Sequence, residues 1–123
     1  MLKQAVPVLH VSSSAAAEAF YGDGLGFRTQ WAYRVDETLP DPCYMGVMRD
    51  GVTLHVSSFS GDGVGRGVVF LLVDDVDALY AEFVAKGVAI DLAPTDQAWG
   101  NREMYVKDPD GNSIRFAREP VAS

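Results

Sequence analysis

The sequence holds one cysteine, Cys43, and lacks any apolar run near the roughly 18 residues that cross a bilayer. One cysteine cannot form an intrachain disulfide, so we expect a protein of the reducing cytoplasm in which Cys43 is a packing residue. Without a long apolar run, no membrane partner is expected. The first residues, MLKQAVPVLHV, carry one lysine and a short apolar run that passes into a strand pattern. They are predicted to be mature sequence and not a signal peptide.

Positive charge is also scarce. Lys and Arg number 10 against 17 Asp and Glu, so the net charge is −7. That field would repel a phosphate backbone, and no nucleic-acid partner is expected. A cationic small molecule would be favoured. Hydrophobic residues, at 48% of 123, are instead plentiful enough for one folded domain spanning 1–123.

An internal repeat organises the chain. Residues 50–56 (DGVTLHV) return as 110–116 (DGNSIRF), an offset of 60, and residues 8–11 (VLHV) are matched by 70–73 (FLLV), an offset of 62. Each Asp-Gly pair leads into an apolar–polar alternation, which is typical of a hairpin that enters a strand. The repeat therefore predicts two modules of the same topology.

A helix is predicted after the first strand of each module, at 14–21 and 75–84. Ser14 and Asp75 are the predicted N-caps, because their side-chain oxygens can accept from free backbone N–H groups. Glycines are predicted to end the helices, at Gly24 and Gly26 in the first module and at Gly87 in the second. The GDGLG stretch at 22–26 is interpreted as such a helix stop and not as a phosphate-binding loop, since no strand precedes it.

These patterns predict an α+β fold of two tandem βαβββ modules whose curved mixed sheets surround a cleft. Module one covers 1–59, a glycine-rich linker covers 60–67 (SGDGVGRG), and module two covers 68–123. The predicted strands are 5–11, 27–35, 43–49, 52–58, 67–73, 88–93, 102–107 and 112–118.

Four stretches carry a resemblance to a known family: AVPVLHV, AFY followed by LGF, VDDVDALYAEFVAKGV, and WGNREMYVKDPDGNSIRF. They resemble the vicinal oxygen chelate superfamily, which includes glyoxalase I, ring-cleaving dioxygenases, fosfomycin-inactivating enzymes and bleomycin resistance proteins. TLHVSS and AWGNRE are most similar to the bleomycin resistance branch. The resemblance implies paired βαβββ modules and a homodimer with ligand clefts at the subunit interface.

Enzymes of this superfamily hold a divalent metal at four strand positions, which the resemblance places on Val6, His55, Val68 and Arg115. The repeat independently makes His55 and Arg115 equivalent. Valine has no donor atom, and arginine keeps its positive charge, so one imidazole remains where a catalytic metal needs at least three donors. No cofactor is therefore expected. One alternative stays open. His10 points to the same face of its strand as Val6, so it could join His55 and Glu103 in an unusual metal-binding triad.

A cleft without a metal can still bind a ligand through aromatic walls. Trp99 is the strongest candidate, because it lies in a loop where core packing does not explain it. Glu103, or an acidic residue from a second subunit, is expected to pair with Arg115. The acidic loop RVDETLPDP, with Asp36, Glu37 and Asp41, is a candidate gate. The full set of predicted ligand-binding residues is Trp31, Tyr33, Tyr44, His55, Phe59, Trp99, Arg102, Glu103, Tyr105 and Arg115.

The favoured hypothesis is a metal-free dimer that sequesters a bleomycin-type antibiotic or a related cationic or aromatic ligand, and that is no enzyme. A metal-dependent lyase, isomerase or dioxygenase using His10, His55 and a carboxylate is the alternative. A binding protein for some other metabolite is the third reading.

Overall fold

The computed structural model describes residues 1–121, which form two four-stranded sheets of the same topology. In sheet 1 the order is β1-β4-β3-β2, and in sheet 2 it is β5-β8-β7-β6. The outer strands β1 and β5 run parallel to β4 and β8, and every other pairing is antiparallel. The α+β class and the βαβββ repeat are thus confirmed.

The strand positions follow the alternation in the sequence. Sheet 1 consists of β1 (Val8–His10), β2 (Arg28–Tyr33), β3 (Tyr44–Arg49) and β4 (Val52–Ser57). Sheet 2 consists of β5 (Val68–Leu72), β6 (Ile90–Asp96), β7 (Arg102–Lys107) and β8 (Ser113–Arg118). Both Asp-Gly turns fall between two antiparallel strands, since β3 and β4 flank the first and β7 and β8 flank the second.

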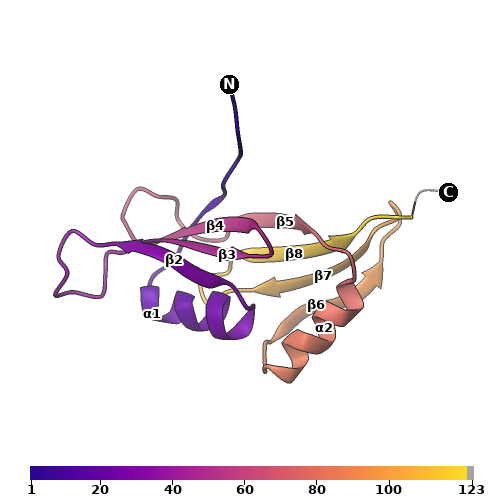
Figure 1. Cartoon of the computed structure of the whole chain (residues 1–123). Coiled ribbons are helices and arrows are strands. Elements are labelled where there is room, and N and C mark those ends of the chain that lie inside the picture. The colour runs from indigo at the N-terminus through magenta and orange to yellow at the C-terminus, as the bar shows by residue number, and fades with distance from the viewer. Residues whose placement is uncertain (122–123) are drawn as a thin grey trace.

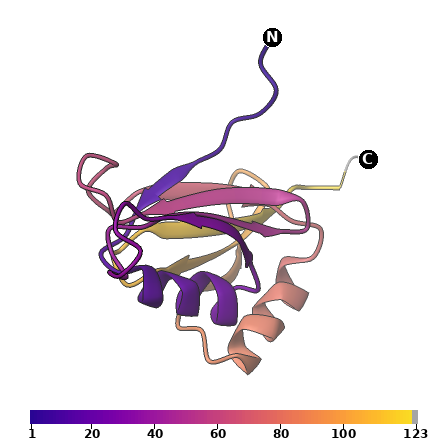
Figure 2. The same ribbon diagram turned by 60° about the vertical axis from the view of Figure 1, so that its left-hand side comes forward.

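Helices cover one side of both sheets, as the two views in Figures 1 and 2 show. The first segment is α1 (Ser14–Ala17), which continues as η1 (Glu18–Gly24), and the second is α2 (Val76–Ala85). Tyr21 of η1 and Phe83 of α2 are fully buried against strand residues such as Leu54 and Ile114. Full burial of an aliphatic or Phe side chain of this kind contributes about 1.5–3 kcal/mol. Among residues 1–121, no helix covers the other side of either sheet, and we call that side the open face.

One of the two predicted helix caps is wrong by a residue. The Ser13 side chain, with extended backbone, accepts from the N–H of Ala16, while Ser14 is the first helical residue and donates its hydroxyl to the carbonyl of Pro40. Ser13 and Ser14 have the same side chain and are equally suited to capping, so residue type alone does not predict which of them is the N-cap. The prediction for Asp75 is confirmed, because its carboxylate accepts from the N–H of Ala78.

The first helix also ends differently from the prediction. It widens into the π-helix η1, which contains Gly22 and Gly24, so these glycines do not terminate it. The termination is at Gly26, whose φ of 80° is readily available only to glycine. Gly87 has the equivalent role after α2, with φ of 77°.

Hydrogen bonds join the two halves of the chain at several points. The Tyr21 hydroxyl donates to the Asp108 carboxylate at 2.7 Å, and the Asn112 amide donates to the carbonyl of His10 at 2.9 Å. Burial, together with the Asp108 carboxylate, raises the pKa of Tyr21 far above its ordinary value. The sheets therefore have a fixed relative position, which in turn fixes how the two open faces are presented.

Within residues 1–121 no helix is both long and apolar enough to span a membrane. Cys43 is 1% exposed and belongs to the core, as expected for a packing residue. The linker between the sheets, residues 60–67, contains a single isolated bridge, between Gly61 and Gly63.

Candidate ligand-binding faces

An aromatic cluster occupies the open face of sheet 1. Trp31 lies parallel to Tyr44, with ring centroids 5.7 Å apart and an interplanar angle of 4°, and it meets His55 edge-on at 5.1 Å. The Tyr44 hydroxyl and Nδ1 of His55 share a hydrogen bond of 2.8 Å. Tyr33 and Phe59 stack nearby, with centroids 6.2 Å apart. Five predicted site residues therefore lie together on this face.

Glycine in β3 makes this arrangement possible. Gly46 is directly opposite both Trp31 and His55 in the sheet register. A Cβ at position 46 would lie 2.6 Å from Cε2 of Trp31, closer than real Cβ atoms approach. The indole therefore lies flat on the glycine backbone, and it remains 46% exposed. The importance of Gly46 cannot be recognised from the local sequence, because it comes from a cross-strand neighbour 15 residues away.

Arginine replaces the aromatic cluster on the open face of sheet 2. Arg115 pairs in register with Phe70 of β5 and Tyr105 of β7, and its guanidinium lies 4.5 Å from the centroid of the Tyr105 ring. Phe70 is 50% exposed. A cation over the face of an aromatic ring is attracted by the ring quadrupole. The ring of Tyr105 thus holds the guanidinium on this face.

A buried carboxylate organises the rest of this face. Glu103 is only 2% exposed, and it accepts from Trp99 Nε1 at 2.9 Å, from the Asn101 amide at 3.1 Å and from the Tyr105 hydroxyl at 2.6 Å. Burial alone raises the pKa of Glu103, but these three donors and the Arg115 charge outweigh it and hold that pKa below its ordinary value. Glu103 is therefore an anion whose role is to fix Trp99, which is 64% exposed.

The expected ion pair between Glu103 and Arg115 is not formed. Tyr105 lies between them, bonded to Glu103 through its hydroxyl and to Arg115 through its ring. Arg115 has no carboxylate within ion-pair distance anywhere in residues 1–121, and its one side-chain hydrogen bond there is from Nε to Ser113 Oγ at 3.3 Å. This arrangement could not be predicted from the sequence, because Tyr105 contacts both the Glu103 carboxylate and the Arg115 guanidinium in place of the ion pair.

Arg102 does not belong to this face. Its guanidinium binds Asp77 of α2 with hydrogen bonds of 2.9 Å and Asp96 at 3.2 Å, which places it on the helix side of sheet 2. The alternation of a strand sends neighbouring residues to opposite faces, so Arg102 and Glu103 could not both have reached one ligand. We remove Arg102 from the candidate set.

The acidic loop is held by its own hydrogen bonds. Asp41 accepts from the N–H of Ser14 at 3.0 Å and from the Ser58 hydroxyl at 2.6 Å, which ties the loop to the start of α1 and to the end of β4. Asp36 accepts from Thr38, and this lowers the pKa of Asp36. These two carboxylates therefore have structural partners already.

The positions that hold a metal in enzymes of this fold do not suit one here. His55 supplies a single imidazole, its Nδ1 is engaged by Tyr44, and Arg115 supplies a cation. Within residues 1–121 no three His, Cys, Asp or Glu side chains form a group that could hold a metal ion. The alternative triad of His10, His55 and Glu103 is thus not assembled within one chain. The donor set does not fit a catalytic metal.

A family model described as "Glyoxalase superfamily protein" matches residues 1–121. The chain belongs to the glyoxalase superfamily. A curated relative, the uncharacterized protein YraH of Bacillus subtilis (strain 168), is 27% identical over 79% of this chain and 83% of its own length. The resemblance found in the sequence motifs is therefore confirmed.

Solved structures with this fold superpose on nearly the whole chain. A bleomycin resistance determinant encoded on transposon Tn5 has a TM-score of 0.77 at 25% identity, covering 98% of this chain and 100% of that one. TnmS3, an antibiotic binding protein from Streptomyces sp. CB03234, has a TM-score of 0.72 at 26% identity, covering 97% and 98%. A bleomycin-binding protein complexed with bleomycin has a TM-score of 0.76 at 23% identity, covering 96% and 99%, and shows the shared fold.

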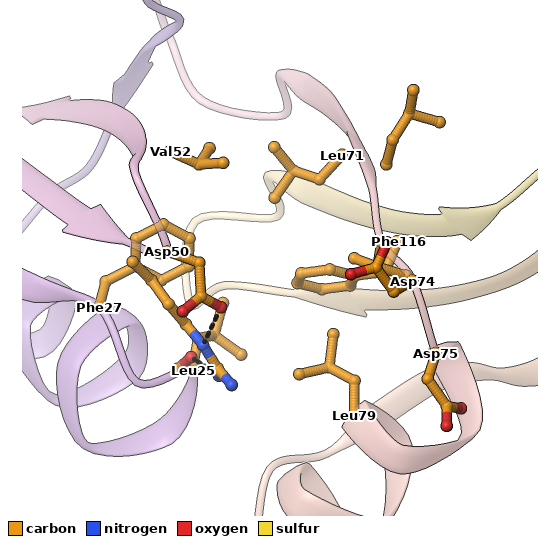
Figure 3. A pocket seen from close by; sticks show the side chains of 12 residues that line it. Leu25, Phe27, Asp50, Val52, Leu71, Asp74, Asp75, Leu79 and Phe116 are labelled. Carbon is orange, nitrogen blue, oxygen red and sulfur yellow. Dashed lines mark hydrogen bonds and ion pairs between the residues drawn. The ribbon is translucent and has the colours of Figure 1, made fainter.

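An apolar hollow of this glyoxalase-superfamily chain lies elsewhere, between the two halves on the helix side. It measures about 370 Å³. Figure 3 shows Phe27 and Val52 of the first half facing Leu71, Leu79 and Phe116 of the second. Two polar groups of its rim are already engaged, since Asp75 caps α2 and Arg49 binds Glu82. None of the predicted site residues lines it, and the open faces carry the polar groups that could recognise a ligand.

Proposed function

We propose that this chain is a binding protein of the glyoxalase superfamily that holds a flat aromatic molecule without transforming it. The observation that carries the proposal is the donor set at the four metal positions, in which two valines and an arginine accompany one histidine. Around those positions stand exposed aromatic rings, which suit binding by stacking. Sequestration in the cytoplasm needs affinity alone.

The proposed site lies between two copies of the chain. The open faces expose apolar side chains that a soluble monomer rarely leaves uncovered together: Val8, Trp31, Tyr33, Met48, Val68, Phe70, Leu72 and Trp99. Apposition of sheet 1 of one copy with sheet 2 of another would cover these side chains and place the aromatic cluster opposite Arg115. A two-fold dimer of this kind has two equivalent sites.

Antibiotics are the ligand class that the relatives suggest. The Tn5 determinant is named for bleomycin resistance and TnmS3 for antibiotic binding, at 25% and 26% identity. We therefore propose metal-free bleomycin as a first probe, together with 2-naphthamide as a neutral planar probe that represents the aromatic part of such ligands. Isothermal titration calorimetry should show saturable binding of at least one of the two, with two ligands per dimer.

Matched variants test the site and the dimer together. Phe70→Asp should convert the dimer to a monomer in light scattering, while Val84→Asp on α2 should leave it intact, because the two residues are equally exposed, at 50% and 51%, but lie on opposite sides of the molecule. Binding should be lost with the dimer. A monomeric wild type, or no saturable heat with either probe up to high micromolar concentration, overturns the proposal.

A metal assay tests the alternative function. Near one equivalent of Zn, Fe, Mn or Ni per purified chain, lost on His55→Ala, would replace the binding proposal with a metalloenzyme. We expect substoichiometric metal that His55→Ala does not change.

A further inference from the structure

The geometry points to a specific ligand chemistry: the aromatic ligand carries a carboxylate, and Arg115 is the residue that selects it. This inference rests on the proposed function and adds the charge of the ligand to it. It departs from the expectation of a cationic ligand that the overall charge suggested. Three features of the open face of sheet 2 carry it.

The first feature is that the guanidinium of Arg115 has unused donors. Arginine has five N–H groups in a planar fork and cannot lose its charge. One face of the fork is stacked on Tyr105, and Nε reaches Ser113 Oγ only at 3.3 Å. No residue among 1–121 accepts from the two terminal nitrogens, so the edge of the fork is free to make the paired hydrogen bonds that match a carboxylate.

The second feature is that the neighbouring carboxylate is inaccessible to a ligand. Glu103 is 2% exposed and accepts from three donors, so a ligand cation cannot reach it without breaking that set. A cation on this face would instead meet Arg115 and be repelled. The same carboxylate accepts from Trp99 and from Tyr105, so it positions the exposed indole directly and the half-buried guanidinium of Arg115 through the Tyr105 ring.

The third feature is that the facing sheet cannot neutralise Arg115. The four strands of sheet 1 read VLH, RTQWAY, YMGVMR and VTLHVS, and they contain no Asp or Glu. The strands of the wall that a second copy would supply are aromatic and carry only neutral or basic side chains, and the Asp62 carboxylate beside Tyr44 already accepts from the Ser57 hydroxyl at 2.7 Å. A covered guanidinium without a counter-charge is costly, so the dimer interface leaves an anion to be supplied by the ligand.

The net charge of −7 does not oppose this assignment. Carboxylates that contribute to it, such as Asp77 and Glu82, lie on α2, on the other side of the sheet. Interactions between exposed charges are largely screened beyond about 8 Å at physiological ionic strength. The local guanidinium therefore decides the sign of the ligand.

Three probes of nearly one shape test the inference: 2-naphthoate, 2-naphthamide and 2-naphthylmethylamine, which differ in charge. With the full-length dimer, calorimetry should give an affinity for 2-naphthoate about tenfold or more above that for 2-naphthamide, which corresponds to one charge-assisted interaction, and the amine should bind most weakly. The chain has two tryptophans, and the indole N–H resonance of Trp99 should shift on binding, with Trp31→Phe used to assign it.

Variants of Arg115 complete the test. Arg115→Met should remove the preference for 2-naphthoate over 2-naphthamide, and Arg115→Lys should retain part of that preference. If 2-naphthamide binds but 2-naphthoate has no advantage, or if the advantage survives in both variants, the inference is wrong while the proposed function stands. If none of the three probes binds, the inference is wrong, and the proposed function fails as well if metal-free bleomycin also gives no saturable heat. A dimer weakened by Arg115→Met would also overturn the inference, because the partner would then supply the anion.

Discussion

Substitution of Gly46 by alanine isolates the aromatic cluster from the rest of the fold. The new Cβ would lie 2.6 Å from Cε2 and 2.8 Å from Cζ2 and Nε1 of Trp31, so the indole must leave the sheet. It can do so, because it is already 46% exposed. Loss of the stack on Tyr44 costs about 0.5–1.5 kcal/mol. Gly46 is not in the positive-φ region, so alanine recovers about 0.4–1 kcal/mol by restricting the unfolded chain.

The two effects nearly cancel, and Gly46→Ala should change the free energy of unfolding by less than about 1 kcal/mol while it displaces Trp31. In a Trp99→Phe background Trp31 is the sole fluorophore of its kind, so acrylamide quenching should rise and the affinity for 2-naphthamide should fall at least fivefold. The control is Gly46→Ala combined with Trp31→Ala, which should be more stable than Trp31→Ala alone, because nothing then clashes. Unchanged quenching of Trp31 in Gly46→Ala would refute the reasoning.

Three further predictions concern the buried polar groups and the dimer. Tyr21→Phe removes a hydrogen bond to a buried carboxylate and should lower the free energy of unfolding in urea by about 1.5–3 kcal/mol. Tyr80 has no such bond among the described residues, so Tyr80→Phe should change that free energy by less than about 0.5 kcal/mol. Equal losses in the two variants would contradict the role of the bond. The pKa of Glu103 is lowered in the folded chain, so its ionised form stabilises the fold above the ordinary carboxylate pKa of about 4.3, and this stabilisation is lost as the pH falls through the lowered pKa. The difference in unfolding free energy between wild type and Glu103→Gln should therefore disappear in acid. A difference that persists at pH 2 would contradict this. Mixing Trp31→Ala with Trp99→Ala subunits should restore about a quarter of the sites, because half of the dimers are hybrids with one intact site of two; no recovery after subunit exchange argues against sites shared between copies.

The repeat made much of this fold predictable. Each Asp-Gly turn, with the alternation after it, correctly predicted a hairpin. The equivalence of His55 and Arg115 is also confirmed, since His55 is in register with Val8 of its outer strand and Arg115 with Phe70 of the other. These signals are local, or they recur at a constant offset, so one sequence contains them. Phe70 itself was missed as a site residue, although its place beside Arg115 follows from the same parallel pairing.

The partners of the polar groups were harder to foresee. Glu103 was expected to meet Arg115, but Tyr105 and Trp99 take its oxygens, and Asn101 completes the set. Which of several nearby donors reaches a carboxylate depends on distances of about 1 Å that alternation does not determine. The same holds for Arg102, whose binding to Asp77 of α2 depends on where a helix 25 residues earlier packs against the sheet.

The bonds between the halves have a consequence for the continuity of the chain. Tyr21 with Asp108, Arg49 with Glu82, and Ser12 with Asp110 all cross from the first half to the second without involving residues 60–67. That segment itself is a loop in which Val64 is 95% exposed. Proteolytic nicking at Val64 should therefore leave two fragments that stay associated and co-elute, and a circular permutant that starts there should keep both open faces.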